Sequence, residues 1–218
     1  MSNSVKTARR TVVPAAPVKR PKAIWFVIGG VFVVALVVSL LVATKGSNDG
    51  NSGLAEFQPV TVTGTPLPKL GDSDTAVGRP IPQVKGASFD GTPVEIANDG
   101  RAKLIFFVAH WCPHCRAEVP VVTAWLESGG APKDVDLYAV STAVSSDQPN
   151  YPPSAWLQRE KWPIATMADN EAASAASAFG LSAFPFFAAV KADGTVALRT
   201  SGELTVAQLS ALAQLARG

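Results

Sequence analysis

The chain has 218 residues, of which 47% are hydrophobic, and a formal net charge of +2 at pH 7. This length suits one domain of ordinary size with additional segments. Six of the 19 Lys and Arg residues lie before residue 23, so the rest of the chain has an acidic excess. Proteins that bind nucleic acid through its phosphates need a basic surface, and we therefore expect no nucleic-acid partner.

Two N-terminal segments predict a membrane anchor. Residues 1–22 are basic and lack hydrophobic periodicity, which predicts a disordered tail. Residues 23–43 contain no charge, and a bilayer-spanning helix needs about 20 such residues, so a transmembrane helix is expected there. The basic tail keeps the N-terminus in the cytoplasm and places the rest of a single-pass cell-membrane protein outside it. The length favours a retained anchor over a cleaved signal peptide, whose apolar region has about 7 to 15 residues.

The next segment, residues 44–74, is rich in Gly, Ser and Pro and has few apolar runs. This composition predicts a flexible linker. A folded domain is expected over residues 75–218.

Strand and helix patterns alternate in this domain. The sequence ASFDGTPVEIA predicts a hairpin, because Asp90-Gly91 between β-forming residues supplies a turn with positive φ. The sequence AKLIFFVA, residues 102–109, is a continuous apolar run, as expected of a strand buried on both faces. A helix is predicted from Cys112 to about Glu127.

The second half of the domain continues the alternation. Strands are predicted in VDLYAVSTAV, PIATMA, FPFFAAV and TVALRTSG, and helices in PPSAWLQREKW, NEAASAASAFG and LTVAQLSALAQLARG. Asn170 and Gly180 are the expected start and stop of the second of these helices, and Thr205 and Gln208 have the spacing of a capping box in the third. The last two strands form a hairpin around KADG. The order predicts an α/β domain with a mixed sheet flanked by helices.

The only two cysteines lie in the sequence WCPHC. At a helix start, the Cys112 sulfur lies near free N–H groups and the positive end of the helix dipole, which favour thiolate over thiol. Pro113 suits the first helical position because it has no N–H to lose. His114, when protonated, adds a second positive charge near the sulfur. The motif therefore predicts a reactive Cys112 thiolate.

Cys115 lies one turn further into the helix, which suits a resolving thiol that attacks a mixed disulfide. A purely structural disulfide is less favoured, because closing so short a loop removes little chain entropy. A metal site is also less favoured, since His110 and His114 are the only histidines and HWCPHC would crowd four ligands into six residues. We therefore expect redox chemistry without a metal or cofactor, and a copper or zinc chaperone is the alternative from another class.

The strand, the WCPHC sequence and the helix, with Pro120 in that helix, resemble the thioredoxin superfamily over about residues 75–218. Phe184-Pro185 before a later strand adds to the resemblance. It implies that Pro185 follows a cis peptide bond and faces the active site. It also implies that Trp111, Phe184 and Pro185 border the substrate groove, with Trp111 partly exposed.

Two groups of this superfamily share features with the chain. The pattern WCxxCRxExP resembles the membrane-anchored TlpA and ResA type, which implies disulfide reduction in cytochrome c maturation. The dipeptide Pro113-His114 instead matches DsbA, which oxidises exported proteins. Because a stabilised reduced form makes a dithiol couple oxidising, the dipeptide favours oxidation. We expect an extracytoplasmic oxidoreductase that oxidises dithiols of exported proteins and is regenerated by a membrane redox partner, with the reductase as the alternative.

One position departs from the thioredoxin pattern. Thioredoxin carries a buried, proton-handling acid six residues before the first cysteine, and this chain has Phe106 there. Proton transfer is then expected to use water or another carboxylate, for which Glu118 is a candidate. The other aromatic residues are expected in the core or the site wall: Phe107, Phe179, Phe186 and Phe187.

Overall fold

The computed structural model describes residues 53–218. The predicted tail (1–22), the predicted transmembrane helix (23–43) and the first part of the predicted linker lie outside the described residues. Within 53–218, no helix has the length and apolar character needed to cross a membrane.

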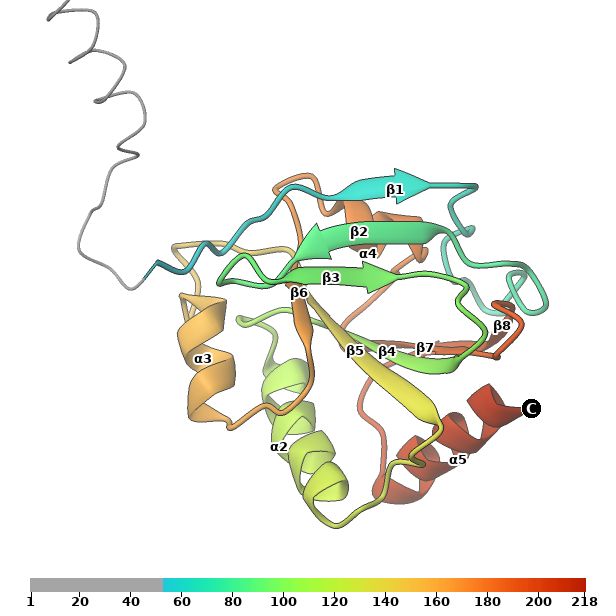
Figure 1. Cartoon of the computed structure of the whole chain (residues 1–218). Coiled ribbons are helices and arrows are strands. Elements are labelled where there is room, and N and C mark those ends of the chain that lie inside the picture. The colour runs from blue at the N-terminus through green and yellow to red at the C-terminus, as the bar shows by residue number, and fades with distance from the viewer. Residues whose placement is uncertain (1–52) are drawn as a thin grey trace, which may run out of the picture. The chain divides into compact units, whose positions relative to one another are not determined.

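A mixed sheet of five strands forms the centre of the domain (Figure 1). Its order is β6-β5-β4-β7-β8, and β4 pairs parallel with β5 but antiparallel with β7. All residues of β4 are buried, as its continuous apolar run predicted. The predicted mixed α/β architecture is confirmed. The strands are β4 (Ala102–Val108), β5 (Val135–Ser141), β6 (Thr166–Ala168), β7 (Phe186–Val190) and β8 (Val196–Ser201).

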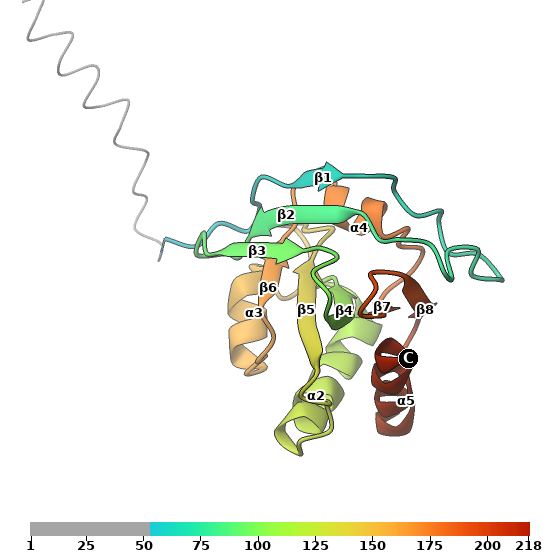
Figure 2. The ribbon, with the colours of Figure 1, turned by 45° about the vertical axis from the view of Figure 1, so that its right-hand side comes forward.

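The two faces of the sheet are covered by different elements (Figures 1 and 2). Leu104 and Phe106 of β4 pack in one cluster with side chains of α2 and α5, whereas Ile105 and Phe107 pack in another with β2, β3 and α4. This alternation follows the two-residue period of a strand. The helices are α2 (Pro113–Glu127), α3 (Pro153–Arg159), α4 (Ser174–Ala178) and α5 (Val206–Arg217).

A second sheet of three antiparallel strands lies over the face that α4 covers. It consists of β1 (Thr61–Thr63), β2 (Gln83–Ala87) and β3 (Pro93–Ile96). The predicted Asp90-Gly91 turn joins β2 to β3, with Gly91 at φ +84°. Here the structure differs from the expected linker over 44–74, because β1 pairs with β2 and Leu67 is buried.

A buried ion pair fixes the same N-terminal segment to the main sheet. Arg199 of β8 contacts the Asp74 carboxylate at 2.5 Å, and its guanidinium also donates to the carbonyls of Pro68 and Phe179 at 2.8 and 2.7 Å. Burial alone raises the pKa of Asp74, but the hydrogen bonds and charge of Arg199, with the Ala76 N–H, lower it overall below its ordinary value of 3.8. Residues 61–74 are therefore part of the folded domain.

Local sequence signals correctly predicted the start of α5 and the end of α4. The capping box of Thr205 and Gln208 is formed at α5, and Gly180 at φ +70° follows α4 as predicted. Helix α4 is shorter than predicted, because the Asp169 carboxylate accepts the N–H groups of Ala175 and Ala176 and Asn170 accepts that of Ser174. Asp169 is itself held by residues at the end of β5, since its N–H donates to the Ser141 carbonyl and its carboxylate accepts the Thr142 hydroxyl.

Candidate active site

Strand β4 leads directly to the two cysteines at the start of α2. Cys112 is the N-cap residue with extended backbone angles, and Pro113 occupies the first helical turn, as predicted. The Arg116 N–H donates to the Cys112 carbonyl at 3.1 Å and starts the helical ladder. Both cysteines are free thiols. The strand-to-helix junction thus presents the first sulfur at the positive end of the helix.

The two thiols differ in burial in the predicted order. Cys112 is 6% exposed and Cys115 is fully buried. The Ala109 N–H donates to the Cys115 sulfur at 3.4 Å. Burial raises the pKa of the Cys115 thiol well above its ordinary value, and the negative charges of Cys112 and Glu118 act in the same direction. Cys112 is therefore the more accessible of the two sulfurs, and the Cys115 thiol holds its proton more tightly than an ordinary cysteine.

The turn before β7 faces Cys112. The Cys112 thiol donates to the Phe184 carbonyl, with 3.9 Å between sulfur and oxygen, and the Phe184-Pro185 bond is cis as predicted. The Trp111 and Phe184 rings meet edge to face at 5.8 Å, and both side chains are half-buried. Trp111 Nε1 donates to the Ala143 carbonyl at 2.7 Å. The three predicted groove residues are thus gathered around one sulfur.

His114 lies on the surface of the first helical turn and has a partner far along the chain. Its Nδ1 lies 2.6 Å from a carboxylate oxygen of Glu203, in the connection between β8 and α5. Sequence reasoning identified His114 but missed Glu203, because 89 residues separate the two. No local pattern in the sequence indicates this pairing.

Glu118 is a buried carboxyl one turn after Cys115 in α2. Burial raises its pKa to about 7, the negative charge of Glu203 adds to that rise, and the N–H of Leu204 opposes it. That N–H donates to Oε2 at 2.9 Å, whereas Oε1 has no hydrogen-bond partner among residues 53–218. A group with a pKa near neutral beside the buried thiol can exchange protons with it.

Phe106, at the position of the thioredoxin acid, has a packing role. Its ring meets those of Trp162 and Phe187 edge to face, at 5.8 and 5.6 Å. Phe107, Phe179, Phe186 and Phe187 are all buried in the core, as expected.

His110 is fully buried and holds the loop after β5 beside Trp111. Its Nδ1 lies 2.7 Å from the Pro149 carbonyl, and Nε2 accepts the Ser145 N–H at 3.2 Å. Because Nε2 accepts, Nδ1 carries the hydrogen and donates. Asn150 also donates to the His110 carbonyl at 3.2 Å. Within the described part of the chain, no three His, Cys, Asp or Glu side chains are grouped so that they could hold a metal ion.

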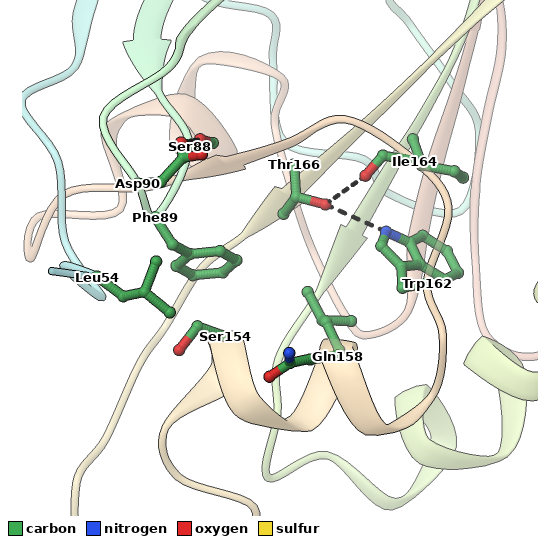
Figure 3. A pocket seen from close by; sticks show the side chains of 10 residues that line it. Leu54, Ser88, Phe89, Asp90, Ser154, Gln158, Trp162, Ile164 and Thr166 are labelled. Atoms are coloured by element: carbon green, nitrogen blue, oxygen red, sulfur yellow. Dashed lines mark hydrogen bonds between the residues drawn. The ribbon is translucent and has the colours of Figure 1, made fainter. Parts of the chain in front are cut away.

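Two cavities lie near the site. One of about 360 Å³ is lined by Trp111 and by Ala143, Ser145 and Gln148 of the loop that His110 holds. The other, of about 290 Å³, lies between α3 and the β2–β3 turn and has no cysteine in its wall (Figure 3). In Figure 3 the Trp162 indole donates to Thr166 at its edge. The first cavity is the one that adjoins the groove residues.

The Redoxin family profile matches residues 76–214, more than half of the chain. The chain belongs to the Redoxin family. This membership, with the free dithiol at the start of α2, identifies a thioredoxin-like thiol-disulfide oxidoreductase and confirms the resemblance inferred from the sequence. No curated protein sequence matches the chain.

Two solved structures with TM-scores of at least 0.50 support the thioredoxin-like fold of this Redoxin-family domain. A protein described as thiol:disulfide interchange protein DsbE from Chlorobium tepidum has a TM-score of 0.53 at 16% identity, over 65% of this chain and 98% of its own. A secreted Mycobacterium tuberculosis disulfide oxidoreductase homologous to E. coli DsbE has a TM-score of 0.50 at 16% identity, over 60% of this chain and 93% of its own. The chain is also similar to StoA from Bacillus subtilis, with a TM-score of 0.49 at 18% identity, over 62% of this chain and 93% of the StoA chain.

Proposed function

We propose that this Redoxin-family oxidoreductase is anchored in the cell membrane and oxidises dithiols of exported proteins outside the cytoplasm. The observation that carries the chemistry is the placement of the two sulfurs, with Cys112 at the Phe184 carbonyl and Cys115 buried beneath it. The dipeptide Pro113-His114 supports the oxidising direction, because a cation near Cys112 favours the reduced, thiolate form of the couple.

In the oxidising direction, a substrate thiolate attacks the Cys112 sulfur of the enzyme disulfide. The S–S bond breaks, and Cys115 leaves with the electron pair and takes a proton, for which Glu118 is the nearest candidate donor. A second substrate thiolate then attacks the substrate sulfur of the mixed disulfide, and Cys112 leaves as thiolate. The substrate dithiol has lost two electrons, which a membrane redox partner must remove to restore the enzyme disulfide.

The location rests on the N-terminal sequence. The uncharged segment 23–43 behind a basic tail supports a single-pass anchor with the catalytic domain outside. A C-terminal alkaline phosphatase fusion, which is active only after export, tests this arrangement. Phosphatase activity with the intact chain, lost on deletion of 23–43, is the expected result, and an inactive fusion would contradict it.

A reductase of the TlpA and ResA type is the second candidate. The feature that favours it is the sequence pattern WCxxCRxExP. Glu118 of this pattern has a pKa of about 7 and can take the proton of Cys115 when that thiol attacks a mixed disulfide. In this direction the reduced enzyme donates two electrons to a substrate disulfide, such as that of an apocytochrome c, and a membrane carrier supplies them.

The reduction potential of the Cys112–Cys115 couple separates the two directions. We would equilibrate the full chain in detergent with glutathione buffers and quantify the free thiols. A potential near about −120 mV supports the oxidase, and one below about −250 mV supports the reductase. A chaperone for copper or zinc would instead bind one metal ion tightly per reduced chain and lack thiol-oxidising and insulin-reducing activity, an outcome that would refute both.

A further inference from the structure

We infer that Glu203 tunes the redox couple as the counter-charge of His114. By compensating the charge of His114, its carboxylate holds the Cys112–Cys115 couple at a less oxidising potential than the Pro113-His114 dipeptide alone would give. This inference deepens the proposed function and rests on its dithiol chemistry. It does not depend on the direction of electron flow.

Three successive residues of the β8–α5 connection each contact a different part of the active site. The Gly202 N–H donates to the carbonyl of Pro185 at 2.9 Å. The Glu203 carboxylate lies 2.6 Å from His114 Nδ1. The Leu204 N–H donates to Glu118 at 2.9 Å. Backbone hydrogen bonds on both sides of Glu203 thus fix its position against the cis-proline turn and α2, unlike an ion pair between two freely moving surface side chains.

The effect of this pair on the sulfur follows from its charges. A protonated imidazole near Cys112 stabilises the thiolate, and stabilising the reduced form raises the reduction potential. When His114 is protonated, the carboxylate at 2.6 Å leaves the pair with no net charge, so the field of the pair at the sulfur is weaker than that of the imidazolium alone. Both side chains are more than 45% exposed, and solvent screening therefore limits the effect to a modest one.

Glu203 also affects the pKa of Glu118. The negative charge of Glu203 contributes to the raised pKa of the buried Glu118 carboxyl. The titratable side chains of residues 112–118 and of the β8–α5 connection are Cys112, His114, Cys115, Arg116, Glu118 and Glu203. Of these, Glu203 contacts the imidazole two residues after Cys112 and raises the pKa of the carboxyl three residues after Cys115.

Glu203→Gln tests the inference, because it removes the charge and keeps an oxygen that can accept a hydrogen bond. We expect the equilibrium with glutathione to shift toward the reduced enzyme by roughly threefold to tenfold, which is about 14 to 30 mV toward a higher potential. His114→Ala should shift the equilibrium in the opposite direction. In the His114→Ala background, Glu203→Gln should still raise the potential by a similar amount, because the fields of the two charges at the sulfur add.

Glu127→Gln is the matched control, because Glu127 is an exposed glutamate at the far end of α2 and loses the same charge. We expect that variant to leave the potential unchanged. Circular dichroism melts of all variants verify that each is folded. An unchanged or lower potential for Glu203→Gln overturns the inference, and so does a shift of the same size for Glu127→Gln.

The same measurements keep this inference separate from the proposed function. If the wild-type potential lies in the reductase range, the oxidase proposal fails, but the change caused by Glu203→Gln is still measured against that lower value. If the wild-type potential lies in the oxidase range and Glu203→Gln has no effect, only the role of Glu203 fails.

Discussion

Glu118 of α2 accepts a hydrogen bond from the backbone N–H of Leu204, so a single buried carboxylate joins the helix of the two cysteines to the start of α5. Its other oxygen has no partner within the described residues. The carboxyl therefore has a structural contact on one side and a free position for a proton on the other. This arrangement connects the stability of the domain to pH.

Replacement of Glu118 by Gln should change how stability depends on pH. The folded-state pKa of about 7 lies above the ordinary value of 4.5, so between these values the folded state binds the proton more tightly than the unfolded state. The free energy of unfolding of the wild type should thus fall as pH rises from about 4.5 to about 7. Denaturant unfolding at about pH 5 and about pH 8 should show a smaller fall for Glu118→Gln.

The same substitution should slow thiol-disulfide exchange. Without an ionisable carboxyl, Cys115 loses its nearby proton donor and acceptor, and we expect a rate decrease of roughly tenfold to a hundredfold near neutral pH. Stopped-flow measurement of tryptophan fluorescence with a dithiol peptide would follow the reaction. Equal rates for both proteins would show that water alone carries the proton.

The two cysteines should fail in different ways when replaced. Cys112→Ser removes the sulfur that meets the substrate and should abolish exchange. Cys115→Ser leaves that sulfur but removes the resolving thiol, so the variant should accumulate mixed disulfides with its substrates. Non-reducing gels and mass spectrometry of the trapped species would measure this. Accumulation by Cys112→Ser instead would reverse the assigned roles.

Arg199→Leu should strongly destabilise the domain. It leaves the Asp74 carboxylate and the carbonyls of Pro68 and Phe179 without their buried donor, and breaking a buried pair costs about 3 to 5 kcal/mol. Because the folded-state pKa of Asp74 is lowered, the stabilisation that this pair gives the wild type should be lost as pH falls below about 3.8. Chemical denaturation measures both effects.

Arg217→Leu is the control for that experiment. Arg217 pairs with Asp134 at 2.8 Å, but both side chains are exposed, so little or no change in the free energy of unfolding is expected. Equal losses for the two arginine variants would contradict the importance given to burial.

His110→Ala should loosen the loop that borders Trp111. The variant loses the bonds to Pro149 and Ser145, and hydrogen exchange at the Ser145 amide should become faster. Tyr151→Ala removes a neighbouring ring, 6.1 Å from the imidazole, without removing either bond, and should leave that amide protected. Unchanged protection in His110→Ala would show that the loop is held by other contacts.

Local sequence signals were enough to predict most of the main sheet. The run at 102–109 became β4, and the turn residues Gly91 and Gly194 lie at positive φ in the two predicted hairpins. The cysteine helix begins at Pro113 and ends at Glu127 as expected. These features depend on periodicity and turn chemistry, which a short stretch of sequence contains.

The remaining features depend on residues that are distant in sequence. In the sequence, Arg199 looks like an ordinary charged residue of a strand, and only the fold shows that it pairs with Asp74. Glu203 likewise looks like an ordinary surface residue, and only the fold shows its contact with His114. β1 was missed because it has three residues among prolines and is stabilised by pairing with β2. The roles predicted for the site residues, the membrane anchor and the direction of electron flow stay predictions until the experiments above are done.

The ion pair between Arg199 and Asp74 also determines where a recombinant fragment can begin. A fragment that started at residue 75 would contain all of the family match but would lack Asp74, the counter-ion of the fully buried Arg199 guanidinium, and strand β1 of the second sheet. Such a fragment should be poorly soluble even though both cysteines are present. A start at about Gly53 retains Asp74, β1 and the contact of Glu56 with Ser154 of α3.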